Sequence, residues 1–215
     1  MINKKLAILI PAFNEEKTIG ELLKELSEKW DVFVIEDKSL DNTLQIVKKY
    51  KVCLIKNSSN IGYSLSIQKG ISKIKNSGYH YVITFDGDGE HRPKDIPKIF
   101  NLLKKGNAMV VGSRDWKNRF IEKITSFFTN LFFKIEDPFC GLKGFDLYKI
   151  NNENKYLRKP MEDVNTYLMF SIIRKKHKYC NYKVKVGQRV PNLNSRFGIN
   201  LIGEIKLLKS LIYWI

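Results

Sequence analysis

The segment Tyr81-Val82-Ile83-Thr84-Phe85 runs directly into Asp86-Gly87-Asp88-Gly89-Glu90. The first five residues are apolar or β-branched without polar alternation, which is typical of a strand buried on both faces of a sheet. Similar runs lie at residues 6–10, 32–35, 52–55 and 108–111, and amphipathic helical patterns separate them. Strands and helices that alternate in this way predict an α/β fold, a single domain with a mainly parallel sheet flanked by helices.

Composition places the chain among ordinary globular proteins. Its 215 residues, 43% of them apolar and 28% charged, suffice for one domain with a substantial core. The net charge of +16 favours an anionic partner such as nucleic acid, a phosphorylated substrate or an acidic membrane surface. Residues 1–110 hold 18 basic and 13 acidic side chains, whereas residues 111–215 hold 20 and 9. The second half therefore supplies most of the attraction for anions.

Cysteine spacing and hydropathy bear on the compartment. Cys53, Cys140 and Cys180 are scattered, so neither a disulfide framework nor a zinc site is expected, and a reducing compartment is the simplest interpretation. The apolar run near the start mimics a signal peptide, but polar residues 14–17 end it without a cleavage pattern, as in a buried first strand. No window reaches the ~18 apolar residues that a spanning helix needs, so we expect any membrane contact to be peripheral.

Two segments of the second half, residues 120–135 and 201–215, have apolar residues at helical spacing with lysines outside the stripe. Each stripe can pack on the sheet, or it can lie among lipid headgroups, as basic amphipathic helices with Phe, Leu and Trp do. Both alternatives stay open. Because the aromatic residues lie in these stripes and not among basic residues, we do not expect nucleic acid as a partner. The first stripe comprises Phe120, Ile124, Phe127, Phe128, Leu131, Phe132 and Ile135.

Polar residues follow each predicted strand, at the edge where ligands of parallel sheets bind. Pro11 ends the first strand pattern, and Asn14 can cap the helix that follows. The adjacent carboxylates Glu36 and Asp37 follow the second strand, where they repel each other and suggest a ligand with hydrogen-bond donors. These two acids are not needed for capping.

The strongest signal is the acidic cluster, which we define as Asp86, Asp88 and Glu90. Three carboxylates at alternate positions of a glycine-containing turn suit Mg²⁺ or Mn²⁺, which prefer oxygen ligands and are usually held by one or two carboxylates plus substrate phosphates. A Ca²⁺ loop is excluded because the helix-flanked loop with its distal glutamate is missing. His91 can be a further ligand or a turn residue, and we favour the turn.

Arginines are the candidate phosphate ligands. Arg114 follows the fifth strand pattern, where it can contact a phosphate or form an ion pair with Asp115. Arg189 and Arg196 lie in a polar loop before the final apolar stripe.

In order and spacing, these segments resemble the family 2 glycosyltransferases, and most closely the branch of dolichyl-phosphate mannosyltransferase. The resemblance covers nearly the whole chain. The sequence departs from the family pattern at Glu36, where the family has Asp, at Lys38, where it has Gly, and at Leu142, where it has an aromatic residue. The matching residues are Pro11, Asn14, Glu15, Asp37, Ser39, Asp41, Thr43, Asn60, Gly62, Gly70, Asp86, Asp88, His91, Pro93, Gly112, Ser113, Arg114, Asp137, Gly141, Lys143, Arg189, Ser195, Arg196 and Gly198.

The resemblance implies a Rossmann-like glycosyltransferase A fold in residues 1–198. Within it, residues 1–115 would form the nucleotide-sugar-binding half and residues 116–198 the acceptor-binding half, and residues 199–215 would form a C-terminal amphipathic helix. The implied enzyme is a metal-dependent inverting hexosyltransferase, such as a mannosyltransferase, that uses a GDP- or UDP-sugar and a polyprenyl or dolichyl phosphate. Its implied place is the cytoplasmic face of a membrane, as a peripheral protein, with an anchoring partner left open.

The resemblance also assigns roles to residues. The nucleotide sugar would be held by Pro11, Ala12, Asn14, Glu15, Asp37, Asp86 and Gly87, and Mg²⁺ or Mn²⁺ by Asp86, Asp88 and Glu90. The catalytic set would be Asp88, Arg114, Arg189 and Arg196, with the arginines positioning the acceptor phosphate. Since that phosphate is ionised at pH 7, no general base would be needed.

Two alternatives remain. A sugar-hydroxyl acceptor in glycan or lipopolysaccharide synthesis would need a base, for which Asp163 or Asp137 are candidates. A non-catalytic membrane-surface nucleotide-binding subunit is disfavoured because the acidic cluster is intact.

Overall fold

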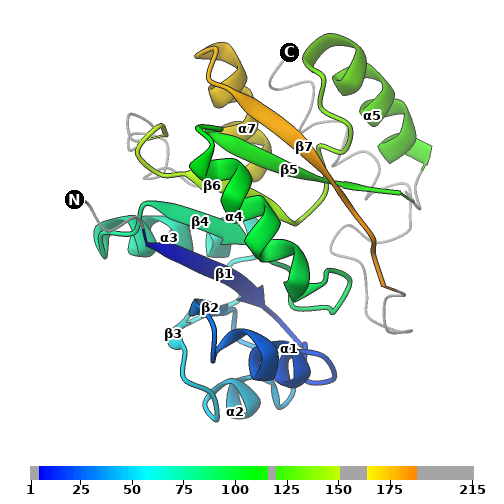
Figure 1. Ribbon diagram of the computed structural model, residues 1–215. Coiled ribbons are helices and arrows are strands. Elements are labelled where there is room, and N and C mark those ends of the chain that lie inside the picture. The colour runs from blue at the N-terminus through cyan, green and yellow to red at the C-terminus, as the bar shows by residue number, and fades with distance from the viewer. Residues whose placement is uncertain (1–4, 116–119, 151–163, 188–215) are drawn as a thin grey trace.

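The computed structural model describes residues 5–115, 120–150 and 164–187, in which a seven-stranded sheet carries helices on both faces (Figure 1). The strand order is β3-β2-β1-β4-β6-β5-β7, and of these seven strands only β6 runs antiparallel to its neighbours. The predicted α/β fold with a mainly parallel sheet is confirmed. The strands are β1 (Leu6–Ala12), β2 (Asp31–Glu36), β3 (Cys53–Lys56), β4 (Tyr81–Thr84), β5 (Met109–Arg114), β6 (Lys143–Asp146) and β7 (Tyr179–Val184).

The sheet separates two apolar layers. Helices α3 and α7 cover one face, where Ile67, Ile71 and Leu168 are fully buried, and α1 and α4 cover the other, where Leu23 and Ile99 are fully buried. Burying one such side chain contributes about 1.5–3 kcal/mol, so the two layers hold the strands in register. The helices are α1 (Ile19–Leu26), α2 (Thr43–Val47), α3 (Tyr63–Asn76), α4 (Ile96–Lys104), α5 (Phe120–Phe133) and α7 (Val164–Arg174), with a 3₁₀ turn η1 (Pro93–Asp95) before α4.

Strand β1 continues past the predicted end at Pro11 to Ala12. Its pairing with β4 stops at Leu9 and Thr84, so at Pro11 the strand has β2 as its neighbour, in register with Ile35. A proline near a strand end with one neighbour leaves most of the ladder intact. The prediction that Pro11 ends the strand was therefore wrong by one residue.

The antiparallel strand β6 shapes the edge where the parallel strands end. It begins at Lys143, which pairs with Thr84, the last residue of β4. The loop that precedes β6, residues 137–142, therefore lies over the carboxyl end of β4, directly beside the acidic cluster. This placement brings together Thr84 and Gly141, which are 57 residues apart in sequence.

Helix α5 confirms the predicted helical pattern. Of the two arrangements left open for its apolar stripe, packing on the sheet does not describe most of these residues. Its apolar residues Ile124, Phe127, Phe128, Leu131 and Phe132 are exposed, while Ile135, just after the helix, is buried in the core. The second stripe, residues 201–215, lies outside the described residues. In residues 5–115, 120–150 and 164–187 no helix has the length and apolar character to span a bilayer.

Candidate active site at the carboxyl edge of the sheet

The loops after β1 and β2 hold each other through reciprocal hydrogen bonds. The backbone N–H of Asn14 donates to Ser39 Oγ at 3.1 Å, and the Asn14 side-chain oxygen accepts from the Leu40 N–H at 2.8 Å. The Glu15 N–H donates to Thr43 Oγ1 at 2.7 Å. Asn14 has a φ of 56°, so it does not cap α1 as predicted but turns the chain toward the second loop. Both loops therefore present one surface beside the ends of β1 and β2.

Asp37 organises the loop that leads into α3. Its carboxylate accepts from Asn57 Nδ2 at 2.8 Å, the Ile61 N–H at 2.9 Å and the Gly62 N–H at 2.8 Å. The adjacent carboxylates suggested a ligand with hydrogen-bond donors. In the structure, the protein itself supplies donors to Asp37. Its neighbour Glu36 likewise accepts from a backbone N–H, that of Ser39, at 2.6 Å.

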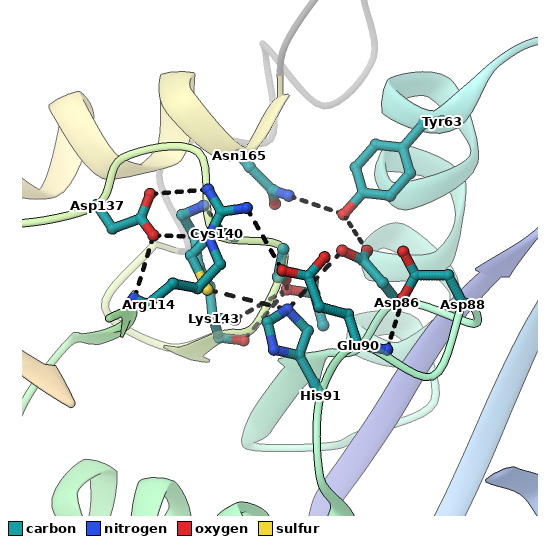
Figure 2. A network of polar contacts seen from close by, with 12 residues as sticks. Tyr63, Asp86, Asp88, Glu90, His91, Arg114, Asp137, Cys140, Lys143 and Asn165 are labelled. Carbon is teal, nitrogen blue, oxygen red and sulfur yellow. Dashed lines mark hydrogen bonds and ion pairs between the residues drawn. The ribbon is translucent and has the colours of Figure 1, made fainter. Parts of the chain in front are cut away.

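The three carboxylates of the acidic cluster lie close together and have different partners (Figure 2). Asp86 Oδ1 accepts from the Tyr63 hydroxyl at 3.0 Å, and Asp88 Oδ1 accepts from the Glu90 N–H at 3.0 Å. Glu90 Oε1 lies 3.6 Å from Arg114 Nη1. Asp88 is buried, and its side chain shapes the turn that carries Glu90.

Arg114 directs its guanidinium to Asp137, not to Asp115. Nε and Nη2 donate to the two Asp137 oxygens at 2.7 and 3.1 Å, and Glu122 Oε2 lies 3.6 Å from Nη2. Burial opposes the charged guanidinium, but the hydrogen-bonded Asp137 outweighs it and raises the pKa of Arg114. Sequence reasoning missed Asp137 as the partner of this fork, because the contact joins residues 23 positions apart.

The loop before β6 packs tightly on Asp86. A Cβ on Gly141 would lie 1.8 Å from Asp86 Oδ2, so the carboxylate occupies the space that any other residue would need at position 141. Lys143 is almost fully buried, and its ammonium donates to the Cys140 carbonyl. This lysine is a second residue that sequence reasoning left without a role, although the family pattern contains it.

His91 is not a simple turn residue. It is buried, with Nε2 3.9 Å from Cys140 Sγ and 4.0 Å from Asp86 Oδ2. Burial lowers the pKa of His91, but Cys140, then Asp86 and Glu90, outweigh burial and raise it to about 9.

Charge at the site is negative although the chain is basic. In the described part of the site Arg114 and Lys143 are cationic and His91 is titratable, and the carboxylates outnumber all three: Asp86, Asp88, Glu90, Glu122 and Asp137. A concentration of carboxylates with this deficit of positive charge favours a bound cation.

Not all predicted site residues can be placed. The described residues bring Pro11, Ala12, Asn14, Glu15, Asp37, Asp86, Gly87, Asp88, Glu90 and Arg114 to one edge of the sheet. Arg189, Arg196 and Asp163 lie outside the described residues. Tyr63 and Glu122, which contact Asp86 and Arg114, had no signal in the sequence that distinguished them from ordinary helix residues.

Comparison with known proteins decides the family. A family model described as glycosyl transferase family 2 matches residues 7–176, most of the chain. The chain belongs to glycosyltransferase family 2. The resemblance inferred from the motifs is thereby confirmed.

Two relatives show how far the similarity of this family 2 glycosyltransferase extends. It is 27% identical over 244 residues to the UDP-N-acetylglucosamine–dolichyl-phosphate N-acetylglucosaminyltransferase of Methanococcus voltae, with 99% of this chain and 96% of the relative covered. It is 28% identical over 127 residues to the dolichol-phosphate mannosyltransferase of Pyrococcus furiosus, with 55% and 35% covered.

A solved structure supports the fold. Glucosyl-3-phosphoglycerate synthase of Mycobacterium tuberculosis, crystallised with Mn²⁺, UDP and glucosyl-3-phosphoglycerate, superposes with a TM-score of 0.74 at 13% identity, covering 98% of this chain and 80% of the synthase. At this identity the likeness concerns the fold, which is that of the A-type glycosyltransferases.

Proposed function

We propose that this family 2 glycosyltransferase moves a hexose from a GDP- or UDP-sugar to a polyprenyl or dolichyl phosphate at a membrane surface, with inversion at the anomeric carbon. The observation that carries the proposal is the acidic cluster at the carboxyl edge of the sheet, within reach of Arg114 and beneath the loop of Gly141. The relatives named for transfer to dolichyl phosphate support the acceptor class.

The residues of the site fit Mg²⁺ or Mn²⁺. Carboxylate oxygens are the donors that both ions prefer, and Asp86 and Asp88 provide the one or two protein carboxylates that a diphosphate-bound ion ordinarily uses. Within the described residues no group of three or more His, Cys, Asp or Glu side chains is arranged to hold an ion by itself. In our proposal Glu90, now beside Arg114, is a third ligand. When bound, the ion acts as a Lewis acid for charge on the leaving diphosphate.

The surrounding side chains hold the donor and the acceptor in place. We propose that the surface formed by Pro11, Ala12, Asn14 and Glu15, with Asp37 behind it, receives the nucleotide. Gly87 is proposed to contact the sugar diphosphate through its backbone, since a Cβ at this position would lie toward the protein, 3.4 Å from Glu15 Cγ and 3.5 Å from Ile19 Cδ1. The Arg114 guanidinium donates to both Asp137 oxygens, so it acts as a fixed positive charge near the acceptor phosphate. Arg189 and Arg196 are proposed to contact that phosphate directly.

The acceptor class follows from the need for a base. A phosphate oxygen is already ionised at pH 7, whereas a sugar hydroxyl needs a positioned base. Asp137 does not suit that task, because it is fully buried and both its oxygens accept from Arg114. This arrangement argues against Asp137 as the base of the sugar-hydroxyl alternative, while the other candidate base, Asp163, lies outside the described residues.

The proposal extends to organisation and location. We assign residues 1–198 to the catalytic domain, with 1–115 for the nucleotide sugar and 116–198 for the acceptor, and residues 199–215 to an amphipathic helix. We place the enzyme at the cytoplasmic face of a membrane as a peripheral protein, where nucleotide sugars and lipid phosphates meet.

The test is release of nucleoside diphosphate by the full chain with Mn²⁺, over a panel of GDP- and UDP-sugars, with and without a short-chain polyprenyl phosphate. We expect one donor to respond to the lipid phosphate. Asp88→Asn keeps an acceptor for the Glu90 N–H but removes the charge, so it should lower the rate at least about 100-fold. Asp31→Asn, at the opposite end of β2, is the matched control and should retain the rate.

Two other results of this assay would each indicate a different function. Release stimulated by sugar acceptors and not by lipid phosphate would establish the hydroxyl alternative. Donor binding without release from any acceptor, equal in wild type and Asp88→Asn, would establish a non-catalytic nucleotide-binding subunit.

A further inference from the structure

Helix α5 turns polar side chains toward the protein and apolar side chains away from it. Its inward side carries the polar residues Glu122, Thr125, Ser126 and Thr129, each 4–7% exposed. Its outward side, which we name the aromatic face, consists of Ile124, Phe127, Phe128, Leu131 and Phe132, which are 37–69% exposed. A helix on a water-facing surface has the opposite arrangement, with apolar residues toward the core.

The aromatic face is a continuous patch. The rings of Phe127 and Phe128 meet edge to face at 5.6 Å, and those of Phe128 and Phe132 are stacked at 6.5 Å. Contiguous exposed apolar patches mark surfaces that another apolar phase covers. In Figure 1, α5 lies at the periphery of the described structure, beside β5 and β7.

A group of cations lies near the C-terminal end of α5 and indicates what covers the aromatic face. The turn between α7 and β7, which we name the basic turn, joins the end of α5 through the Tyr179 hydroxyl, which donates to the Phe133 carbonyl at 2.7 Å. The ring of Phe133 packs on Phe170 of α7 at 5.4 Å. Exposed aromatic side chains beside exposed lysines match the acyl boundary and the anionic headgroups of a membrane leaflet. The basic turn comprises the exposed residues Arg174, Lys175, Lys176 and Lys178.

We infer that the aromatic face of α5 inserts into the headgroup and acyl boundary of an anionic phospholipid bilayer, with the basic turn against the headgroups. This inference deepens the proposed function and rests on it for its purpose. The inward side of α5 reaches the site through Glu122, 3.6 Å from Arg114. A bilayer on the outward side is then separated from Arg114 by roughly one helix diameter, about 10 Å, so the headgroup of a lipid acceptor arrives near the acidic cluster.

The experiment is co-sedimentation of the full chain with vesicles of phosphatidylcholine alone and of phosphatidylcholine with phosphatidylglycerol. We expect binding to the anionic vesicles and little to the neutral ones. The triple variant Phe127→Ser, Phe128→Ser, Phe132→Ser should bind about 100-fold more weakly, because three apolar side chains no longer enter the boundary. Leu40→Ser removes a more exposed apolar side chain outside the patch, 86% exposed, and should bind like wild type.

Charge is tested separately. Lys176→Glu with Lys178→Glu should weaken binding to the anionic vesicles by at least about tenfold and leave the weak binding to neutral vesicles unchanged. Hydrogen exchange of residues 120–133 should slow when anionic vesicles are added. Thermal unfolding of each variant confirms that it is folded.

Other occupants of the patch give distinct results. Concentration-dependent dimers that the triple variant abolishes, without vesicle binding, would assign the face to a second copy. Slow exchange at residues 120–133 that vesicles do not change would assign it to another part of this chain. Either result overturns the inference.

The membrane-binding inference and the proposed function can each be refuted without the other. Vesicle binding without lipid-phosphate-dependent release would retain the surface and reject the acceptor. Release of nucleoside diphosphate with a short soluble acceptor, but without vesicle binding, would support the lipid-phosphate acceptor and reject the membrane-binding surface.

Discussion

At the residue scale, the site depends on buried polar groups whose partners come from distant segments. Asp37 receives three hydrogen bonds from the loop before α3, and Asp137 receives the fork of Arg114 from the end of β5. A buried carboxylate that lost these donors would keep its full desolvation cost, so each acid fixes the loops around it. The acids of this edge therefore shape the site.

Gly141 allows Asp86 to lie where it does, because its missing side chain leaves room for the carboxylate. In Gly141→Ala the new Cβ would lie 1.8 Å from Asp86 Oδ2, so the carboxylate must move. Displacing a reactive group by about 1 Å costs on the order of 100-fold in rate, and we expect that loss in nucleoside diphosphate release. Gly20→Ala is the control, because its Cβ would make ordinary contact with Ile46 at 3.4 Å. Equal rates in wild type and Gly141→Ala would refute this account.

Lys38 stands where the family has glycine, and its φ of 62° is left-handed. A side chain in this conformation costs about 1–2 kcal/mol, which glycine avoids while losing more freedom on folding. Lys38→Gly should therefore raise the free energy of unfolding by about 0.5 kcal/mol. Lys48→Gly, at a φ of −60°, should lower it by about 0.5–1 kcal/mol, and urea denaturation compares the two. If Lys38→Gly lowered the free energy of unfolding as much as Lys48→Gly does, the backbone at Lys38 would not be strained.

At the scale of elements, β1, β2, β4 and β5 could be predicted because they are buried on both faces and read as apolar runs, and the edge strand β3 because its sequence is also mostly apolar. The parallel strand β7 was not predicted, because it is half-buried and polar residues interrupt its apolar ones. Strand β6 could not be predicted either, because Lys143-Gly144-Phe145-Asp146 has no such run and is buried only through its neighbours. Helix α5 was predicted as a helix, but periodicity does not tell which side faces the protein. Similarly, the acidic cluster was visible as a motif, whereas the contacts of Tyr63 and Glu122 depend on how distant elements pack.

Strand β7 holds the loop that carries Asp137. The Asn181 side chain accepts from the Glu136 N–H at 3.1 Å and donates to the Lys134 carbonyl at 2.7 Å. Asn181→Ala leaves both backbone groups without this partner at a half-buried place, so we expect a loss of about 1 kcal/mol in unfolding free energy and a lower rate of release. Asn101→Ala, exposed on α4, should change stability by less than about 0.5 kcal/mol.

Denaturant unfolding and release assays on the same preparations check this prediction. A stable Asn181→Ala protein with an unchanged rate would mean that the loop of Asp137 is held by Arg114 alone.

At the scale of the whole molecule, the charges are separated by function. The chain carries +16 overall, yet the described site holds more carboxylates than cations, and exposed lysines and an arginine gather in the basic turn beside α5. A cluster of carboxylates favours a divalent cation, whereas a basic exterior attracts anionic lipid. Net charge alone predicts an anionic partner, but the separation of charges is a property of the folded chain.

This separation predicts a salt dependence that differs between acceptors. The electrostatic attraction between the basic turn and an anionic leaflet acts over a screening length of about 10 Å at 0.1 M salt and about 3 Å at 1 M. Transfer to a polyprenyl phosphate in anionic vesicles should therefore fall steeply with salt, whereas transfer to a short soluble acceptor should fall much less. The measurement is nucleoside diphosphate release against salt concentration for both acceptors. The Lys176→Glu, Lys178→Glu variant should respond less steeply with vesicles, and parallel curves for the two acceptors would show that salt acts at the site itself.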